Sequence, residues 1–392
     1  MEINSSEYSL LHRCAALQAE AFLVGNGKKK VGLDVTSLLH GAQVTGVERV
    51  IVETHKHLTN FLDPEAYELL PISTVPELKK KSSMHPYLAT DPVLAKPLAD
   101  LSECDILFLT NINVGLPMRE LVALKKEKNL KIISLIHDIL PIKHPEWFAT
   151  PEKPNGESIT LSGKHFFQIY LQATFALSDQ MILTSEHVKN EIISLGWKSL
   201  PQFKIIPLGS FDTNPLSKKR EKAGLNTIYV STITIRKGHA QLLEAIEILW
   251  AQGVEITLTL VGGVGWMISD FIDKVNNHPE NGKRLFWKQR LLDSDVEQIY
   301  ADSDIAFAPS YEEGFGFAAE EALPKGLKVI ARDIPVFRER PYPNLYFFNG
   351  QTEDLSQKIL EVAQLPVKPI NPGTIRTMQA FAQDVAEIIS LL

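Results

Sequence analysis

The sequence is poor in the residues that build cross-linked or membrane-spanning proteins. Only two cysteines, Cys14 and Cys104, occur in 392 residues, so neither a disulfide framework nor a cysteine-based zinc site is expected. No apolar run approaches the roughly 18 residues that a membrane-spanning helix needs. The N-terminus lacks the charged start and the apolar core of a secretory signal. Together these absences predict a protein of the reducing cytoplasm.

The chain also lacks a strong excess of charge of one sign. Its formal net charge of −7 disfavours a general nucleic-acid binder, which typically carries a basic surface. Lysines gather in the first half of the chain, at positions 28–30, 79–81, and 125, 126 and 128. Such clusters are usually solvated surface; the alternative is peripheral contact between the N-terminal domain and the anionic inner face of a membrane.

The composition is that of a soluble globular protein with about two domains, since 44% of the residues are hydrophobic and 22% are charged. Short apolar runs bounded by turn residues predict strands, with helical patterns between them. The predicted strands are 30–35, 68–72, 105–109, 131–136, 180–183 and 204–206, followed by 227–231, 255–261, 285–287 and 305–308. This alternation predicts an α/β protein with two doubly wound parallel sheets.

Turn residues near 208–224 separate the two series of strands. The predicted domains are therefore 1–210, including a helical extension at 1–27, and 211–372. A helix is predicted to begin at Met267, after a glycine-rich loop, and a terminal helix is predicted within 373–392.

The stretch 309–339 combines features that are typical of a ligand site. The apolar strand 305–308 stops at Pro309, two glycines follow in an acidic loop, and an alanine-rich helix is predicted to begin at Phe317. Such a unit opens a ligand crevice at the carboxyl edge of a parallel sheet. Glu313 would approach the ligand from the loop and Glu321 from the helix, while backbone N–H groups from Gly314 to Phe317 can hold an anion. Hydroxyl and phosphate groups occur together in a nucleotide sugar, which fits both features.

Three further segments lie at predicted strand ends. Arg236 and Lys237 are expected at the beginning of a helix after the strand 227–231, where basic residues oppose the helix dipole and need either solvent or a compensating anion such as a diphosphate. His137 follows the strand 131–136. Gly46 begins a helical pattern, with Thr45 as its predicted N-cap.

The run Glu313-Gly314-Phe315-Gly316, with the segments 321–322, 329–331 and 334–339, resembles the donor-site signature of the family 4 retaining glycosyltransferases of the GT-B fold. The sequence departs from that pattern at Ala318 and Lys328, where proline is common, and at Ser231 and Thr232, which replace glycine. The resemblance implies two Rossmann-like domains that face each other across a cleft. It also implies a terminal helix at 373–392 that crosses back to the first domain.

The resemblance further implies roles for individual residues. Arg236 and Lys237 would grip the donor diphosphate, Glu321 the ribose hydroxyls, and Glu313 the sugar hydroxyls. The implied catalytic residues are His137, Glu313, Arg236 and Lys237. The implied donor-binding residues are Gly46, Arg236, Lys237, Gly314, Phe315, Gly316, Phe317 and Glu321. No metal and no cofactor are expected, since the basic residues and the helix dipole would neutralise the diphosphate.

The implied activity is retaining transfer of a hexosyl group from a nucleoside-diphosphate sugar to a glycan or lipid-linked glycan in polysaccharide biosynthesis. UDP-hexose is preferred as donor and GDP-mannose comes next. Two other classes remain open. One is a nucleotide-sugar epimerase or phosphorylase on the same scaffold, and the other is a non-catalytic glycan-binding subunit.

Overall fold

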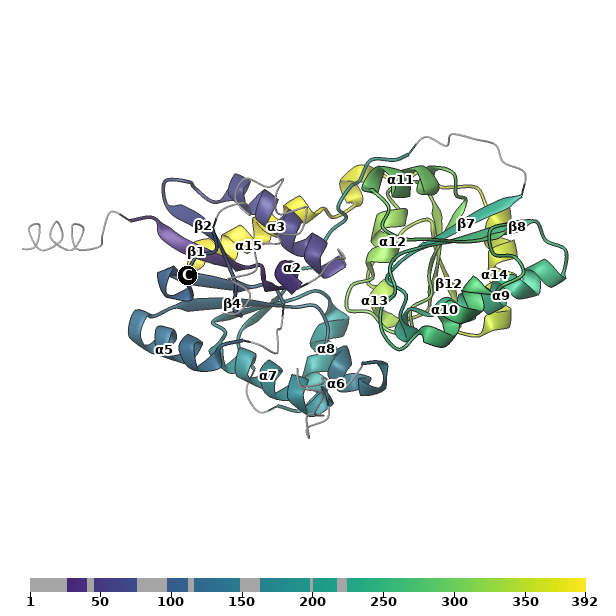
Figure 1. Cartoon of the computed structure of the whole chain (residues 1–392). Coiled ribbons are helices and arrows are strands. Elements are labelled where there is room, and N and C mark those ends of the chain that lie inside the picture. The colour runs from purple at the N-terminus through teal and green to yellow at the C-terminus, as the bar shows by residue number, and fades with distance from the viewer. Residues whose placement is uncertain are drawn as a thin grey trace, which may run out of the picture.

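The computed structural model of the protein describes residues 27–40, 46–75, 97–111, 116–148, 163–197, 200–216 and 224–392. These residues form two α/β halves that lie side by side (Figure 1). The predicted extension before residue 27, the predicted N-cap Thr45 and the lysines at 79–81 lie outside the described residues.

The first half is built on a six-stranded parallel sheet with the strand order β2-β1-β3-β4-β5-β6. Its strands are β1 (Lys29–Asp34), β2 (Tyr67–Ile72), β3 (Ile106–Leu109), β4 (Lys131–Ile136), β5 (Gln180–Leu183) and β6 (Phe203–Ile205). The strands read as nearly continuous apolar runs because helices cover both faces of the sheet (Figure 1). The helices are α2 (Thr36–His40), α3 (Gly46–Phe61), α5 (Met118–Lys128), α6 (Leu140–Lys143), α7 (Gly163–Leu177) and α8 (Glu186–Ser194).

The second half has the same architecture, with the strand order β12-β11-β10-β7-β8-β9. Its strands are β7 (Leu225–Val230), β8 (Ile256–Val261), β9 (Leu285–Lys288), β10 (Ile305–Ala308), β11 (Lys328–Arg332) and β12 (Leu345–Phe348). Its helices are α9 (His239–Ala251), α10 (Ser269–Asn276), α11 (Asp293–Ala301), α12 (Phe317–Ala322), α13 (Pro335–Arg338) and α14 (Thr352–Gln364). The predicted pair of doubly wound parallel sheets is therefore confirmed.

The helix that was predicted to begin at Met267 begins at Ser269. Met267 has a φ of 55°, which is left-handed backbone that a helix cannot contain. Strand β12 was not predicted, because its four residues follow a segment with two prolines and resemble a loop in sequence.

The last helix, α15 (Met378–Leu391), packs on the first half of the molecule (Figure 1). Phe381 and Val385 of α15 share one buried cluster with Val50 and Leu58 of α3. Thr377 caps α15, because its hydroxyl accepts a hydrogen bond from the N–H of Ala380 at 3.1 Å. Helix α15 therefore contributes to the core of the first half.

Strand order places two loops of the second half next to each other. The chain runs from β7 outward through β8 and β9, and β10 then returns to the other side of β7. The loops that follow β7 and β10 therefore meet at the point where the strand order reverses, which is where ligands bind in open α/β sheets. In the part of the chain that the structure describes, no helix has the length and apolar character needed to cross a membrane.

Candidate active site

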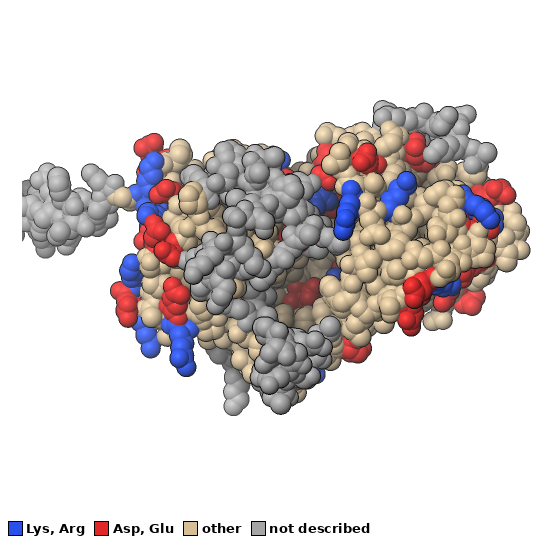
Figure 2. Space-filling view, in the orientation of Figure 1, with Lys and Arg blue, Asp and Glu red and all other residues tan. Residues whose placement is uncertain are grey.

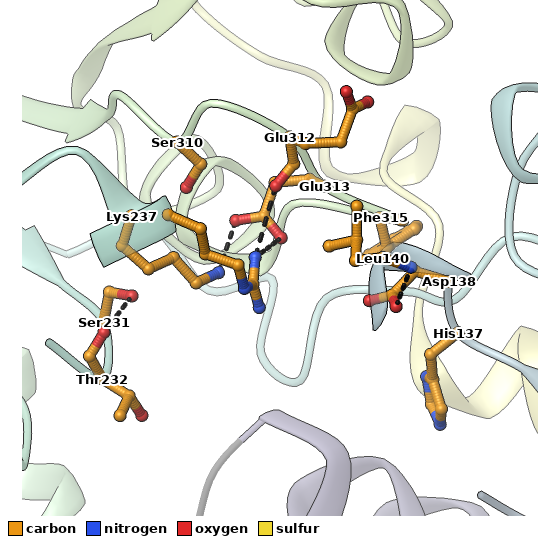
Figure 3. Close-up of polar contacts among 12 residues, drawn as sticks. His137, Asp138, Leu140, Ser231, Thr232, Lys237, Ser310, Glu312, Glu313 and Phe315 are labelled. Carbon is orange, nitrogen blue, oxygen red and sulfur yellow. Dashed lines mark hydrogen bonds and ion pairs between the residues drawn. The ribbon is translucent and has the colours of Figure 1, made fainter. Parts of the chain in front are cut away.

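A buried carboxylate joins the two loops at this switch point. Glu313, in the loop after β10, forms ion pairs with two basic residues of η4 (Ile235–Lys237), the turn after β7. Its Oε2 atom lies 3.2 Å from Nη1 of Arg236, and its Oε1 atom accepts from Nζ of Lys237 (Figure 3). Glu313 is only 8% exposed. The sequence prediction grouped these three residues around one ligand, and the structure places their charged atoms in contact.

Close backbone packing fixes this arrangement. The N–H of Tyr311 donates to the carbonyl of Arg236 at 2.9 Å, so the two loops are hydrogen-bonded to each other. Gly238 has a φ of 71°, and a Cβ atom there would lie 2.5 Å from the carbonyl oxygen of Pro309. Arg236 and Lys237 thus lie in a 3-10 turn before Gly238, and α9 begins only at His239. The expectation that they open the helix itself was wrong, because the left-handed glycine separates the turn from α9.

The direct ion pairs in this cluster join two cations to one carboxylate. Burial alone would raise the pKa of Glu313, but the charges of Lys237 and Arg236 outweigh burial and hold this pKa at about 2. Burial and the neighbouring Arg236 lower the pKa of Lys237. The pKa of Arg236 is raised, since Glu313 and Asp138 more than offset its burial. Two cations therefore compete for one ionised carboxylate, and an added anion would stabilise both.

The basic residues also keep hydrogen-bond donors available. Within the described part of the chain, Lys237 uses one of its three N–H donors, on Glu313. Arg236 donates through Nη1 to Glu313 and to the carbonyl of Glu312, at 3.2 and 3.3 Å. The remaining N–H groups form the donor set that phosphate oxygens accept from.

His137 lies at the end of β4, as predicted, but its ring points away from the Glu313 cluster (Figure 3). Its Nε2–H donates to the carbonyl of Thr110 at 2.9 Å. Burial lowers the pKa of His137, which favours the neutral ring. Its own carbonyl accepts from the hydroxyl of Thr184 at 2.9 Å. The carbonyl, rather than the ring, therefore faces the second half.

Gly314 is the point where the second half docks onto the first. Its carbonyl accepts from the hydroxyls of Thr184 and Ser185, at 3.1 and 2.9 Å. A Cβ atom at Gly314 would collide with the carbonyl oxygen of His137. Gly316, the residue before α12, has a φ of 93° and packs against the ring of Phe337. Both glycines are thus required by close approach, in addition to any contact with a ligand.

Glu321 meets the first half of the molecule at a second place. Its carboxylate lies 2.8 Å from the guanidinium of Arg49, a residue of α3. The guanidinium also lies 4.1 Å from the ring centroid of Phe211, which stacks on Phe317. The Phe317 ring in turn packs against Gly46, at the start of α3. The structure therefore brings Glu321, Phe317 and Gly46 together across the two halves, and Phe315 packs beside Phe317.

Sequence reasoning missed several residues that connect the halves. His187 of α8 pairs with Glu312 at 2.6 Å, and the carboxylate of Glu339 accepts from the N–H groups of Glu186 and His187 at 3.0 and 2.6 Å. Asp138 acts electrostatically on Arg236. Two of them had a signal in the sequence, since Asp138 follows His137 at a strand end and Glu339 closes the segment 334–339 of the family signature. Figure 2 shows a hollow between the halves with acidic side chains inside it.

A small crevice lies behind Glu313, lined in part by Asp138 and His187. Its volume of about 10 Å³ accommodates roughly one water molecule. This crevice is therefore too small to hold a ligand larger than water. Among the described residues, no group of three His, Cys, Asp or Glu side chains is placed to hold a metal ion.

Residues 212–369 match the family described as Glycosyl transferases group 1. Over 362 residues, the chain is 28% identical to the serotype-specific mannosyltransferase WbdA of Escherichia coli. That match covers 85% of this chain and 42% of WbdA, so the chain spans less than half the length of this relative.

Two solved structures share the architecture of both halves. Anabaena Alr3699/HepE in complex with UDP-glucose is 18% identical with a TM-score of 0.59, and the match covers 93% of this chain and 100% of that one. The apo form of the lipopolysaccharide outer core galactosyltransferase WaaB is 20% identical with a TM-score of 0.59, covering 93% and 99%. At these identities the similarity shows the fold.

Proposed function

We propose that this chain, which has the GT-B fold and whose residues 212–369 match the group 1 glycosyl transferases, transfers a hexosyl group from a nucleoside-diphosphate sugar to a glycan in polysaccharide biosynthesis. The observation that carries the proposal is the buried cluster of Arg236, Lys237 and Glu313. In the part of the chain that the structure describes, its two cations share one directly paired carboxylate and keep unused donors, and the cluster lies at the strand switch point.

In the proposed reaction the bond between the anomeric carbon and the diphosphate oxygen breaks, and its electron pair leaves with the diphosphate. An acceptor hydroxyl oxygen forms the new bond to the anomeric carbon, and its proton passes to the leaving diphosphate. Arg236 and Lys237 stabilise the charge that develops on the diphosphate. Glu313 accepts hydrogen bonds from sugar hydroxyls. Glu321 accepts from the ribose after releasing Arg49.

We further propose retention of configuration at the anomeric carbon and catalysis without a metal ion. The family resemblance supports retention. Two buried cations beside one carboxylate support metal-free neutralisation of the diphosphate, because they supply the charge that a divalent ion supplies elsewhere.

Two donors, UDP-hexose and GDP-mannose, are proposed as alternative sources of the transferred sugar. UDP-hexose is the preference drawn from the sequence. The relative WbdA is a mannosyltransferase at 28% identity, and this observation favours a mannosyl group, with GDP-mannose as its donor. The acceptor is proposed as a glycan or lipid-linked glycan.

We place the reaction in the cytoplasm, with peripheral contact between the first half and an anionic membrane as a further proposal. Two lysines of α5 that could contact the membrane already have partners within the protein, which counts against this contact. Lys125 pairs with Asp179, and Lys128 donates to the carbonyl of Ser102 at 2.8 Å. Flotation with anionic vesicles, compared with neutral vesicles, tests this contact.

A thermal-shift panel with UDP, GDP, dTDP and ADP, in magnesium or in a chelator, tests the proposed donor class. A ligand at 100 times its dissociation constant stabilises the native state by about 2.7 kcal/mol, which raises Tm by several degrees. We expect one diphosphate to raise Tm in the chelator, and to do so far less in Lys237→Ala. No shift with any nucleotide would favour a non-catalytic glycan-binding subunit. Conversion of the donor sugar without an acceptor would favour an epimerase.

A further inference from the structure

Three aromatic side chains from both halves meet beside the candidate active site. Trp147 belongs to η3 (Pro145–Trp147) in the first half, whereas Trp266 follows β8 and Tyr311 follows β10 in the second. The indole N–H of Trp266 donates to the carbonyl of Trp147 at 2.7 Å. The ring centroids of Trp147 and Tyr311 are 6.3 Å apart. These three residues, the aromatic cluster, form a surface that neither half possesses alone.

The aromatic cluster is held in place but remains partly exposed. The imidazole of His144 stacks on Trp147, with the ring centroids 3.9 Å apart, and the guanidinium of Arg332 lies 4.2 Å from the ring centroid of Tyr311. Even so, Trp266 and Tyr311 each keep 40% of their surface in solvent. Grouped, oriented and exposed aromatic rings are typical of a binding surface, because an unliganded protein gains nothing from leaving them in water.

The aromatic cluster is continuous with the proposed donor site. Tyr311 lies two residues before Glu313, and its N–H donates to the carbonyl of Arg236 at 2.9 Å. A molecule lying on these rings therefore extends to the edge of the Glu313 cluster.

We propose that the aromatic cluster is a subsite for the acceptor glycan, which rests on the proposed function of the neighbouring site. The C–H faces of sugar rings pack on aromatic faces, while sugar hydroxyls find the exposed carboxylate of Glu146, which pairs with His144 beside Trp147. A lipid tail would instead place apolar groups against this charged pair and remove it from water, which is costly. Since both halves contribute rings, the acceptor chain binds only when the halves are together.

The test measures binding of α-mannotriose to the full chain without nucleotide, by ligand-observed NMR titration. Trp266→Phe keeps an aromatic face but loses the N–H that reaches Trp147, whereas Trp266→Leu loses both. We expect Trp266→Phe to bind within about threefold of wild type. Trp266→Leu and Tyr311→Leu should bind about tenfold more weakly, which corresponds to ~1.4 kcal/mol. Leu391→Ala, an exposed residue at the end of α15, serves as the control and should bind as wild type does.

Three results would overturn the subsite. The first is wild-type affinity in both leucine variants, and the second is no binding of α-mannotriose to wild type. The third is an equal loss in Trp266→Phe and Trp266→Leu, which would mean that Trp266 only connects the halves. Nucleotide-induced stabilisation is recorded for every variant. It shows that the variant is folded, and its absence in wild type would count against the proposed function alone.

Discussion

Replacing Glu313 by glutamine should weaken the ligand-free protein and strengthen its response to a nucleotide. Glu313→Gln keeps the shape of the side chain but removes the carboxylate that directly pairs with both Arg236 and Lys237. The two cations then remain buried without their counter-ion, which is costly. A diphosphate would restore the missing negative charge.

The pKa of Glu313 gives the size of the effect. It is lowered from 4.5 to about 2, and at 1.36 kcal/mol per pKa unit the ionised carboxylate stabilises the fold by roughly 3 kcal/mol. This contribution is complete above pH 4.5 and is lost as the pH falls from 4.5 towards 2. At neutral pH, Glu313→Gln should therefore lower Tm by roughly 6–12 °C, at about 2–4 °C per kcal/mol for a domain of this size.

The assay is differential scanning fluorimetry at pH 7, with and without saturating GDP or UDP. We expect the nucleotide to raise the Tm of Glu313→Gln by more than it raises that of wild type. Glu361→Gln, an exposed partner of Lys358, is the matched control and should change stability by less than about 1 kcal/mol. Wild-type Tm in ligand-free Glu313→Gln, or an equal nucleotide response in the two proteins, would refute the reasoning.

Three further predictions concern the contact between the halves. Gly314→Ala should weaken the apparent affinity for the nucleotide at least tenfold, because a Cβ atom at this position collides with the backbone at the end of β4. A wild-type affinity in a thermal-shift titration would contradict this prediction. Arg49→Ala removes a cross-domain ion pair worth about 1 kcal/mol, so the radius of gyration in solution scattering should increase, whereas Arg49→Lys should retain wild-type scattering. The hydrogen bond to Glu312 raises the pKa of His187 and outweighs burial, which lowers it. The His187–Glu312 contact is therefore complete below about pH 6.5 and is lost as the pH rises through the raised pKa. Glu312→Gln should lower the pKa of His187 in an NMR titration, and an unaltered value would rule out this pairing.

The sequence predicted the site wherever local signals were strong. Pro309 ends β10 and Gly316 precedes α12, so the loop that carries Glu313 has the predicted bounds. Parallel topology then places that loop beside Arg236 and Lys237, since β10 pairs with β7. This step needs the strand order, which the structure supplies; the alternation of strands and helices predicted only that the sheet is parallel and doubly wound.

Contacts between the halves could not be predicted in the same way. Glu321 has a signal as a ligand-binding carboxylate, but nothing in the sequence indicates its partner Arg49, which is 272 positions away. The same holds for His187 and Glu312. These pairs depend on the rotation of one half against the other, and many small surfaces set that rotation together. Short segments such as β12 also gave no signal, because four residues beside prolines carry too little periodicity.

The most direct test of the central claim is a transfer assay with GDP-mannose and UDP-glucose in a chelator, using a panel of oligosaccharide acceptors. Products are detected by mass spectrometry, and nucleoside diphosphate release gives the rate. We predict that one donor adds a single hexose to an acceptor, and that Lys237→Ala is at least about tenfold slower, the effect of losing ~1.4 kcal/mol of transition-state stabilisation. The account would be contradicted if a nucleotide binds but no acceptor gains a hexose, or if Lys237→Ala transfers at the wild-type rate.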